Sequence, residues 1–295
     1  MIDILLVNPV FLSQNEAERE LMNPYFPLGL LYLAAFIREQ GFSVEIFDGT
    51  FQDGLDDFNK SLKKFAPNFV GITAVKPNRE LALAVAEIAH AFGGKVILGG
   101  PDPTYTPKTY LASSHVDIVV HHEGELTLLE LLQMGKEIRD LNQIDGIAFR
   151  DQDGAVVINP RRDFILNLDE LPLPARDLID MDQYLNVWRE HNGYASLTIS
   201  VGRGCPFGCE WCQDAVHGPK LRQRSPESVV EEVKSLMAIY NIDRLRVIDD
   251  VDGLDSEWLA EWERVAVAEN AIVPFEALND LERQDIPMLD VRDSL

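Results

Sequence analysis

The first 150 residues alternate short apolar runs with segments of helical periodicity. The apolar runs predict five strands: Ile4–Val7, Val44–Phe47, Phe69–Ala74, Lys95–Leu98 and Val116–Val120. The periodic segments predict three helices: Leu28–Glu39, Asn78–Ala91 and Glu125–Met134. Strands that alternate with amphipathic helices pack as a parallel sheet with helices on both faces. The alternation therefore predicts an α/β fold whose first domain is built on a parallel sheet.

Small, polar or conformationally special residues follow every predicted strand of this domain. They are Asn8-Pro9, Asp48-Gly49, Thr73-Ala74, Gly99-Gly100 and Glu123-Gly124-Glu125. A single glycine at a strand end is often only a turn former. Parallel sheets, however, bind ligands beyond the carboxyl ends of their strands, so five such ends favour a binding domain. The first strand is not followed by G-x-G-x-x-G, so a dinucleotide ligand is not favoured.

The remaining residues are predicted to form a connector and a second α/β segment. A hairpin joins Gly146–Arg150 to Ala155–Asn159 through an Asp-Gly turn, and a polar, aromatic stretch follows it. The second segment has predicted strands and helices in alternation: Ser196–Val201, Ser225–Tyr240, Arg244–Ile248, Ser256–Glu269 and Ile272–Ala277. We therefore expect three parts, comprising residues 1–145, 146–195 and 196–295.

The charge balance excludes some classes of partner. The chain has 26 Lys and Arg against 49 Asp and Glu, a net charge of −23. Such a surface aids solubility and repels the phosphates of nucleic acids and anionic lipid headgroups. No run approaches the ~18 to 20 apolar residues of a membrane span, and the first residues lack the basic region of a signal peptide. We expect a cytoplasmic protein without nucleic-acid or membrane partners.

Three cysteines, Cys205, Cys209 and Cys212, lie within eight residues of one another and are the only cysteines of the chain. An odd, clustered set is a poor disulfide framework and a good candidate for metal binding. Structural zinc needs four ligands, and His217 is the nearby residue that can complete the set. A thiol–disulfide exchange pair of Cys209 and Cys212 leaves the third cysteine unexplained. A [4Fe–4S] cluster on three thiolates leaves one iron open to another ligand.

The motif Cys-x3-Cys-x-Trp-Cys follows a predicted strand and resembles the cluster motif of the radical S-adenosylmethionine enzymes. Further segments resemble the cobalamin-binding subfamily of these enzymes, which includes the anaerobic magnesium-protoporphyrin monomethyl ester cyclase and several methyltransferases. These segments are residues 27–30, 41–49, 70–73, 98–101, 116–117, 123–125, 222–228 and 249–250. The resemblance therefore extends over nearly the whole chain, from residue 2 to residue 290.

The resemblance implies a fold and a set of site residues. The fold is an N-terminal flavodoxin-like (Rossmann-type) parallel-sheet domain followed by a partial (β/α) radical S-adenosylmethionine barrel. Cys205, Cys209 and Cys212 would ligate the cluster. Trp211 would lie near the adenosyl group, or be a packing aromatic. Asp249 and Asp250 would face S-adenosylmethionine, or form a solvated turn. The residues implied to line the corrin site are Asn8, Thr73, Gly99, Gly100 and Glu125.

Two features depart from the family pattern. No D-x-H-x-x-G string occurs, so a bound corrin would lack that histidine ligand; His121 and His122 are expected to be surface or core residues. An eight-unit barrel takes about 250 residues, so residues 196–295 hold only about three units, against the six of the family. Three explanations stay open: the remainder comes from a partner or a second copy, the chain is a shortened homologue, or the half-barrel is covered in another way.

The function that the resemblance implies is that of an enzyme. Its reduced [4Fe–4S] cluster would cleave S-adenosylmethionine to a 5′-deoxyadenosyl radical, and cobalamin would take part in methylation, oxidation or cyclisation. The implied partners are a small-molecule substrate and an electron donor such as flavodoxin or ferredoxin. A catalytically incomplete cluster- and cobalamin-binding subunit or sensor, and a zinc-stapled α/β protein, remain open alternatives. No catalytic residue is assigned.

We predict that Cys209→Ala abolishes the iron chromophore and leaves the N-terminal domain folded, because the thiolates act as ligands and the core does not depend on them. Absorption spectra of anaerobically purified protein, with far-ultraviolet circular dichroism as the folding control, check this. An unchanged brown protein would contradict the cluster assignment.

Overall fold

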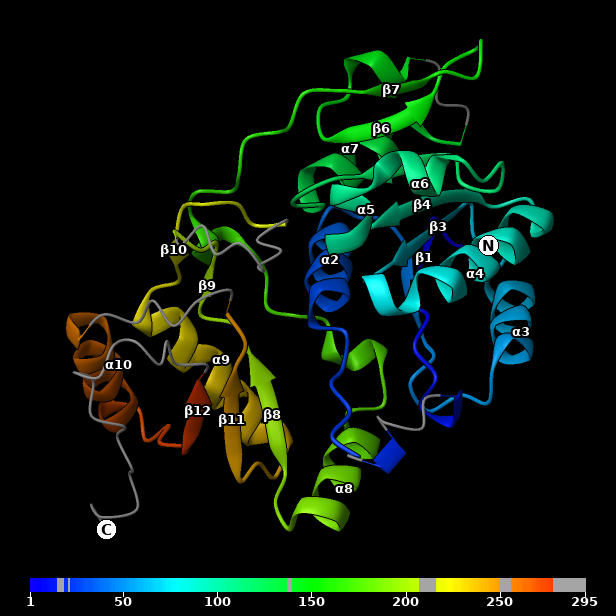
Figure 1. Cartoon of the computed structure of the whole chain (residues 1–295). Helices are drawn as coiled ribbons and strands as arrows, with labels where there is room; N and C mark the ends of the chain where they lie inside the picture. The colour runs from blue at the N-terminus through cyan, green and yellow to red at the C-terminus, as the bar shows by residue number, and fades with distance from the viewer. Residues whose placement is uncertain (15–18, 21, 137–139, 207–215, 250–255, 278–295) are drawn as a thin grey trace.

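The computed structural model describes residues 1–14, 19–20, 22–136, 140–206, 216–249 and 256–277 (Figure 1). Its larger sheet has seven strands in the order β2-β1-β3-β4-β5-β6-β7. Their bounds are β1 Ile4–Asn8, β2 Val44–Asp48, β3 Phe69–Thr73, β4 Lys95–Gly99, β5 Ile118–Val120, β6 Ile147–Arg150 and β7 Val156–Ile158. Strands β1 to β5 are parallel, and β6 and β7 add to the sheet antiparallel. The order 2-1-3-4-5 is that of a flavodoxin-like fold, which confirms the predicted class.

Helices cover both faces of this sheet because side chains alternate along each buried strand. From β1, Ile4 and Leu6 join a core with α2 (Leu28–Glu39) and α7 (Glu125–Met134). Leu5 and Val7 join the opposite core, with α3 (Leu55–Phe65), α4 (Arg79–Phe92) and α6 (Pro107–Leu111). A short helix α5 (Pro101–Tyr105) follows β4. Strands buried on both sides read as continuous apolar runs, which is why the sequence located them.

The second sheet is smaller and has three parallel strands in the order β12-β11-β8. Its elements are β8 Ser196–Ile199, α9 Pro226–Ile239, β11 Arg244–Val247, α10 Ser256–Ala268 and β12 Phe275–Ala277. A two-stranded antiparallel ribbon, β9 (Gly202–Arg203) with β10 (Arg222–Gln223), follows β8. The core beside α2 continues into this part through buried residues such as Leu197 and Val229.

The connector contains a helix that the sequence analysis did not predict. Helix α8 (Met181–Asn192) begins after Asp180, whose carboxylate accepts a hydrogen bond from the Gln183 N–H at 3.0 Å. The Tyr184 hydroxyl donates to Asp48 at 2.6 Å, which fastens the helix to the end of β2. Figure 1 shows α8 leading directly into β8. The connector is therefore a docked element that places the second sheet relative to the first.

Five short 3-10 turns complete the described elements: Leu12–Gln14, Lys76–Asn78, Leu141–Gln143, Leu168–Glu170 and Arg176–Leu178. Among the described residues, no helix has the length and apolar character needed to cross a membrane.

Candidate functional site

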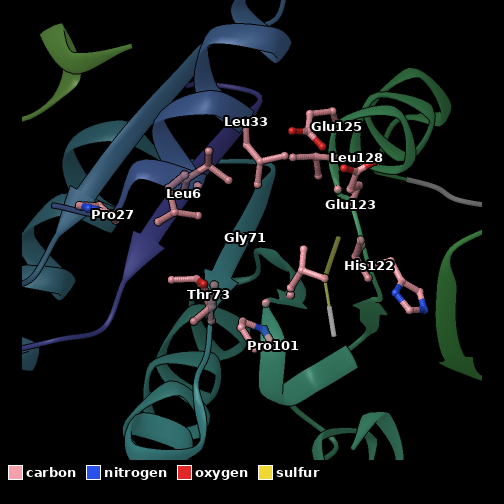
Figure 2. A pocket seen from close by; sticks show the side chains of 18 of the residues that line it. Leu6, Pro27, Leu33, Gly71, Thr73, Pro101, His122, Glu123, Glu125 and Leu128 are labelled. Atoms are coloured by element: carbon pink, nitrogen blue, oxygen red, sulfur yellow. The ribbon is translucent and has the colours of Figure 1, made fainter. Parts of the chain in front are cut away.

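A cavity of about 370 Å³ lies at the carboxyl ends of the strands of the larger sheet. It spans β1, β3, β4 and β5 and includes the boundary between β1 and β3, the switch point at which doubly wound sheets of this strand order bind ligands. Figure 2 shows Leu6 and Pro27 on one side of this space and His122 and Glu123 on the opposite side. Leu33 and Leu128 close it from α2 and α7. The walls are thus mostly apolar, with a few charged groups.

The five strand-end residues that the sequence singled out all line this cavity: Asn8, Thr73, Gly99, Gly100 and Glu125. The Asn8 side chain is held by its hydrogen bond to Asp48, at 3.0 Å. Gly100 has φ +105°, and a Cβ there would lie 2.8 Å from the Ala74 carbonyl oxygen, so the position favours glycine. The topology brings the five residues together, and their contact with a corrin stays a prediction.

Gly29, in the first turn of α2, also lines the cavity. A Cβ at this position would meet no atom within 4 Å. The missing side chain therefore leaves open space beside the cavity, which a larger residue would fill.

His122 is a cavity residue that the sequence analysis expected on the surface or in the core. It is the second residue after β5 and has φ +64°, which is uncommon for a residue other than glycine. Its N–H donates to the Thr104 hydroxyl at 3.1 Å, which holds this turn. The neighbouring His121 is buried, and burial lowers the pKa of its imidazole.

The cysteine loop begins at the carboxyl end of the second sheet. Cys205 follows β9 and is buried, and its N–H donates to the Gly218 carbonyl at 3.0 Å. This bond and the pairing of β9 with β10 bring together the described residues on either side of the cysteine motif. The other predicted ligands, Cys209 and Cys212, lie outside the described residues, as do Trp211 and Asp250.

Asp249 follows β11 and reaches the neighbouring strand end. Its carboxylate accepts hydrogen bonds from the Ser200 hydroxyl at 3.0 Å and from the Val201 N–H at 2.9 Å. These bonds tie the end of β11 to the turn between β8 and β9, just before the cysteine loop. The predicted role of Asp249 toward S-adenosylmethionine stays a prediction.

A buried charge bridge joins the two parts of the site. It consists of Glu123 and Glu125, which follow β5, and Arg203 and Arg222, which lie in the β9–β10 ribbon. Arg203 donates to Glu125 at 2.7 Å and to Glu123 at 3.3 Å, and Arg222 donates to Glu123 at 2.8 Å. The side chains of all four residues are at most 8 % exposed. Sequence reasoning did not foresee the two arginines here, although one stands in Gly202-Arg203-Gly204, immediately before the first cysteine.

The bridge favours the charged form of Glu125. Burial by itself raises the pKa of Glu125, but the Arg203 guanidinium outweighs burial and holds that pKa below its ordinary value. Tyr32 of α2 lies beside the bridge with its ring under Arg203, and burial, reinforced by Glu232, raises its pKa to about 12. Around neutral pH Glu125 is therefore a carboxylate that faces the Arg203 guanidinium, next to the neutral phenol of Tyr32.

Three similarities to known proteins bear on this geometry. Residues 19–132 match the model of the B12 binding domain. An uncharacterized methyltransferase of Pyrococcus horikoshii is 35% identical over 279 residues, covering 87% of this chain and 59% of that protein. The anaerobic magnesium-protoporphyrin IX monomethyl ester cyclase of Rubrivivax gelatinosus is 26% identical, covering 81% of this chain and 43% of the relative. This chain contains a match to the B12 binding domain and is similar in sequence to a methyltransferase and to an anaerobic magnesium-protoporphyrin IX monomethyl ester cyclase.

A solved structure has a similar fold. The cobalamin-dependent S-adenosylmethionine radical enzyme OxsB, with aqua-cobalamin and S-adenosylmethionine bound, superposes with a TM-score of 0.77 at 18% identity. The match covers 93% of this chain and 38% of OxsB. The chain thus spans about half the length of the curated relatives described above.

We predict that Glu125→Gln destabilises the fold by about 2 kcal/mol at pH 7, the value of a buried hydrogen bond to a charged group. The folded-state pKa of Glu125 lies below its ordinary value of 4.5, so its stabilisation is complete above that value and is lost as the pH falls through the folded-state pKa. Urea unfolding of both proteins at pH 7, 5 and 4 measures this. A difference that grows toward low pH would contradict the ion pair.

Proposed function

We propose that this chain is a radical S-adenosylmethionine enzyme that uses a [4Fe–4S] cluster and cobalamin to methylate, oxidise or cyclise a small-molecule substrate. An electron donor such as flavodoxin or ferredoxin would reduce the cluster. The observation that carries the proposal is the composite cavity. It lies at the switch point of a B12-binding domain, and Arg203, Val216 and His217, on either side of the cysteine loop, complete its wall. The cavity proposed for cobalamin thus adjoins the residues that flank the cysteine motif proposed for the cluster.

The described residues fit cobalamin in their chemistry. Apolar side chains from β1, α2 and α7 suit the flat, largely apolar surface of a corrin, and the absent side chain at Gly29 leaves room beside them. Polar groups are few and fixed, as the hydrogen bonds of Asn8 and Glu125 illustrate. OxsB, which has the same fold, binds aqua-cobalamin.

The cysteine loop fits a cluster. Three thiols at C-x3-C-x2-C spacing follow a strand of the second sheet, and Cys205, the one that the structure describes, is buried. Burial keeps water from that sulfur, and solvent exposure is one of the factors that set a cluster's reduction potential. Three thiolates leave one iron open, where S-adenosylmethionine would bind.

The chain's own contribution is positioning and exclusion of water. When bound, the cluster supplies the electron that splits S-adenosylmethionine into methionine and a 5′-deoxyadenosyl radical, and cobalamin supplies methyl transfer or redox chemistry. Asp249 holds the turn that leads into the loop. Leu33 and Leu128 close the cavity toward the core of the first domain. The charge bridge keeps the β9–β10 ribbon against the end of β5.

We predict that Gly29→Leu raises the Kd for hydroxocobalamin by about tenfold or more, because the new side chain occupies open space at the cavity. Leucine is also the better helix former, so the thermal stability is expected to stay the same or rise. Absorbance titration and thermal melting measure the two quantities. The control is Glu39→Leu, at the exposed far end of the same helix. Equal loss of affinity in both variants would contradict the assigned cavity.

The catalytic proposal predicts that anaerobically reconstituted protein, given S-adenosylmethionine and dithionite, forms 5′-deoxyadenosine and methionine in equal amounts. Cys212→Ala, treated identically, is expected to form neither. Liquid chromatography with mass spectrometry quantifies both products. If protein with a full cluster forms neither product, the proposal that this chain is active by itself is wrong. The alternative, a catalytically incomplete cluster- and cobalamin-binding subunit, is then favoured.

A further inference from the structure

The side-chain amide of Asn8, at the end of β1, is oriented by groups at the end of β2. Its nitrogen donates to the Asp48 carboxylate at 3.0 Å and to the Thr50 hydroxyl at 3.3 Å. An amide nitrogen has two hydrogens, so both are used here. The reverse orientation would place the amide oxygen against a carboxylate, which accepts hydrogen bonds and cannot donate one. The Asn8 oxygen, Oδ1, therefore points away from Asp48.

The accepting roles of Asp48 and Thr50 are themselves fixed. The Asp48 carboxylate also accepts from the Thr50 hydroxyl at 2.7 Å and from the Tyr184 hydroxyl at 2.6 Å. Because the Thr50 hydroxyl gives its hydrogen to Asp48, it can only accept from Asn8. Burial, reinforced by Asp48, raises the pKa of Tyr184, so this hydroxyl keeps the proton that it donates. A chain of hydrogen bonds that begins in α8 thus determines the orientation of Asn8.

The Asn8 oxygen is left available on the side of the cavity. Strand β1 lies between β2 and β3, and the strands that line the cavity are β1, β3, β4 and β5. Asn8 is 6 % exposed, and within the described part of the chain no donor reaches its Oδ1 atom. A buried acceptor without a donor is costly unless a ligand or water satisfies it. This oxygen is therefore an acceptor offered to the occupant of the cavity.

Thr73, at the end of β3, supplies a donor beside this acceptor. Val7 pairs with Ile72, so Asn8 and Thr73 are the next residues of two neighbouring strands, and both line the cavity. Figure 2 shows Thr73 among the residues around this space. A hydroxyl can donate as well as accept, whereas the oriented Asn8 amide can only accept. The two strand ends therefore present an acceptor next to a donor, in walls that are otherwise mostly apolar.

We propose that Asn8 and Thr73 form a carboxamide-binding subsite, in which a side-chain amide of the corrin ring donates its N–H to Asn8 and accepts from the Thr73 hydroxyl. The inference rests on the proposed function. Cobalamin carries carboxamide groups around its ring, and a carboxamide satisfies both residues at once. An ester or a carboxylate has no N–H and would leave the Asn8 oxygen unpaired. Asn8 is thus a specificity-determining residue that selects amidated corrins.

The test compares two neutral probes that differ in their donors. Dicyanocobinamide has amide side chains, and the heptamethyl ester of dicyanocobyrinic acid has ester side chains without any N–H. Quenching of tryptophan fluorescence measures the Kd of each probe, and the ratio of the two Kd values in the unmodified chain is the reference. In Asn8→Leu the preference for the amide is expected to fall by about tenfold, because only the amide loses a buried hydrogen bond.

The fold is expected to tolerate this change, because Asp48 keeps its hydrogen bonds from Thr50 and Tyr184. Asn8→Ala removes the same amide with a smaller side chain and serves if the Leu variant does not fold. The matched control is Asn186→Leu, at an exposed position of α8. It is expected to leave both Kd values unchanged.

Thr73→Val gives a different expectation from the same subsite. Amide and ester both have a carbonyl that can accept from the Thr73 hydroxyl, so both Kd values are expected to rise by a similar factor. The ratio of the two Kd values is expected to stay at the reference. A purely structural effect of the Asn8 variants would have this same form, with an equal loss for both probes.

An unchanged ratio in the folded Asn8 variant would therefore overturn the subsite and leave the proposed function standing. Binding of hydroxocobalamin without binding of dicyanocobinamide would also exclude it, because the contact would then need the nucleotide that cobinamide lacks. If the unmodified chain binds neither hydroxocobalamin nor the two probes, the proposed function is wrong, and the subsite with it.

Discussion

The buried pairing of Glu123 and Glu125 with Arg203 and Arg222 is the contact on which the rest of the site depends. Charged groups removed from water are tolerated only when they are paired and hydrogen-bonded, so the two parts of the chain have few acceptable relative positions. The carboxylates follow a strand of the first sheet, and the guanidinium groups flank the cysteine loop. The bridge therefore makes one composite site from two sheets.

The place of that site follows from strand order. Because β2 and β3 pair with opposite edges of β1, the helices that follow β1 and β3 lie on opposite faces of the sheet, and the loops that lead to them leave a crevice between them. Apolar side chains from α2 and α7 line the crevice, and the absence of a side chain at Gly29 leaves space beside it. The ribbon after β8 then closes it from the second sheet. Neither sheet by itself supplies all of the walls.

Sequence reasoning was most successful where burial repeats regularly along the chain. The strands of the larger sheet and the helices at 28–39 and 125–134 were predicted within a few residues, and the five strand-end residues share one cavity. Helix α8 was missed because its anchors, such as the bond from Tyr184 to Asp48, join residues 136 positions apart. The partners of Arg203 and Arg222 were missed for the same reason, since no local pattern shows that a distant carboxylate will face them.

The central claim is that one chain holds a cluster and cobalamin at adjoining sites. The most direct test is iron, sulfide, zinc and cobalt analysis of anaerobically reconstituted protein after addition of hydroxocobalamin and removal of the excess, together with an absorption spectrum. We expect about four irons and four sulfides per chain, as in a [4Fe–4S] cluster, with about one cobalt retained. Zinc without iron would contradict the claim and leave a structural metal site in an α/β protein.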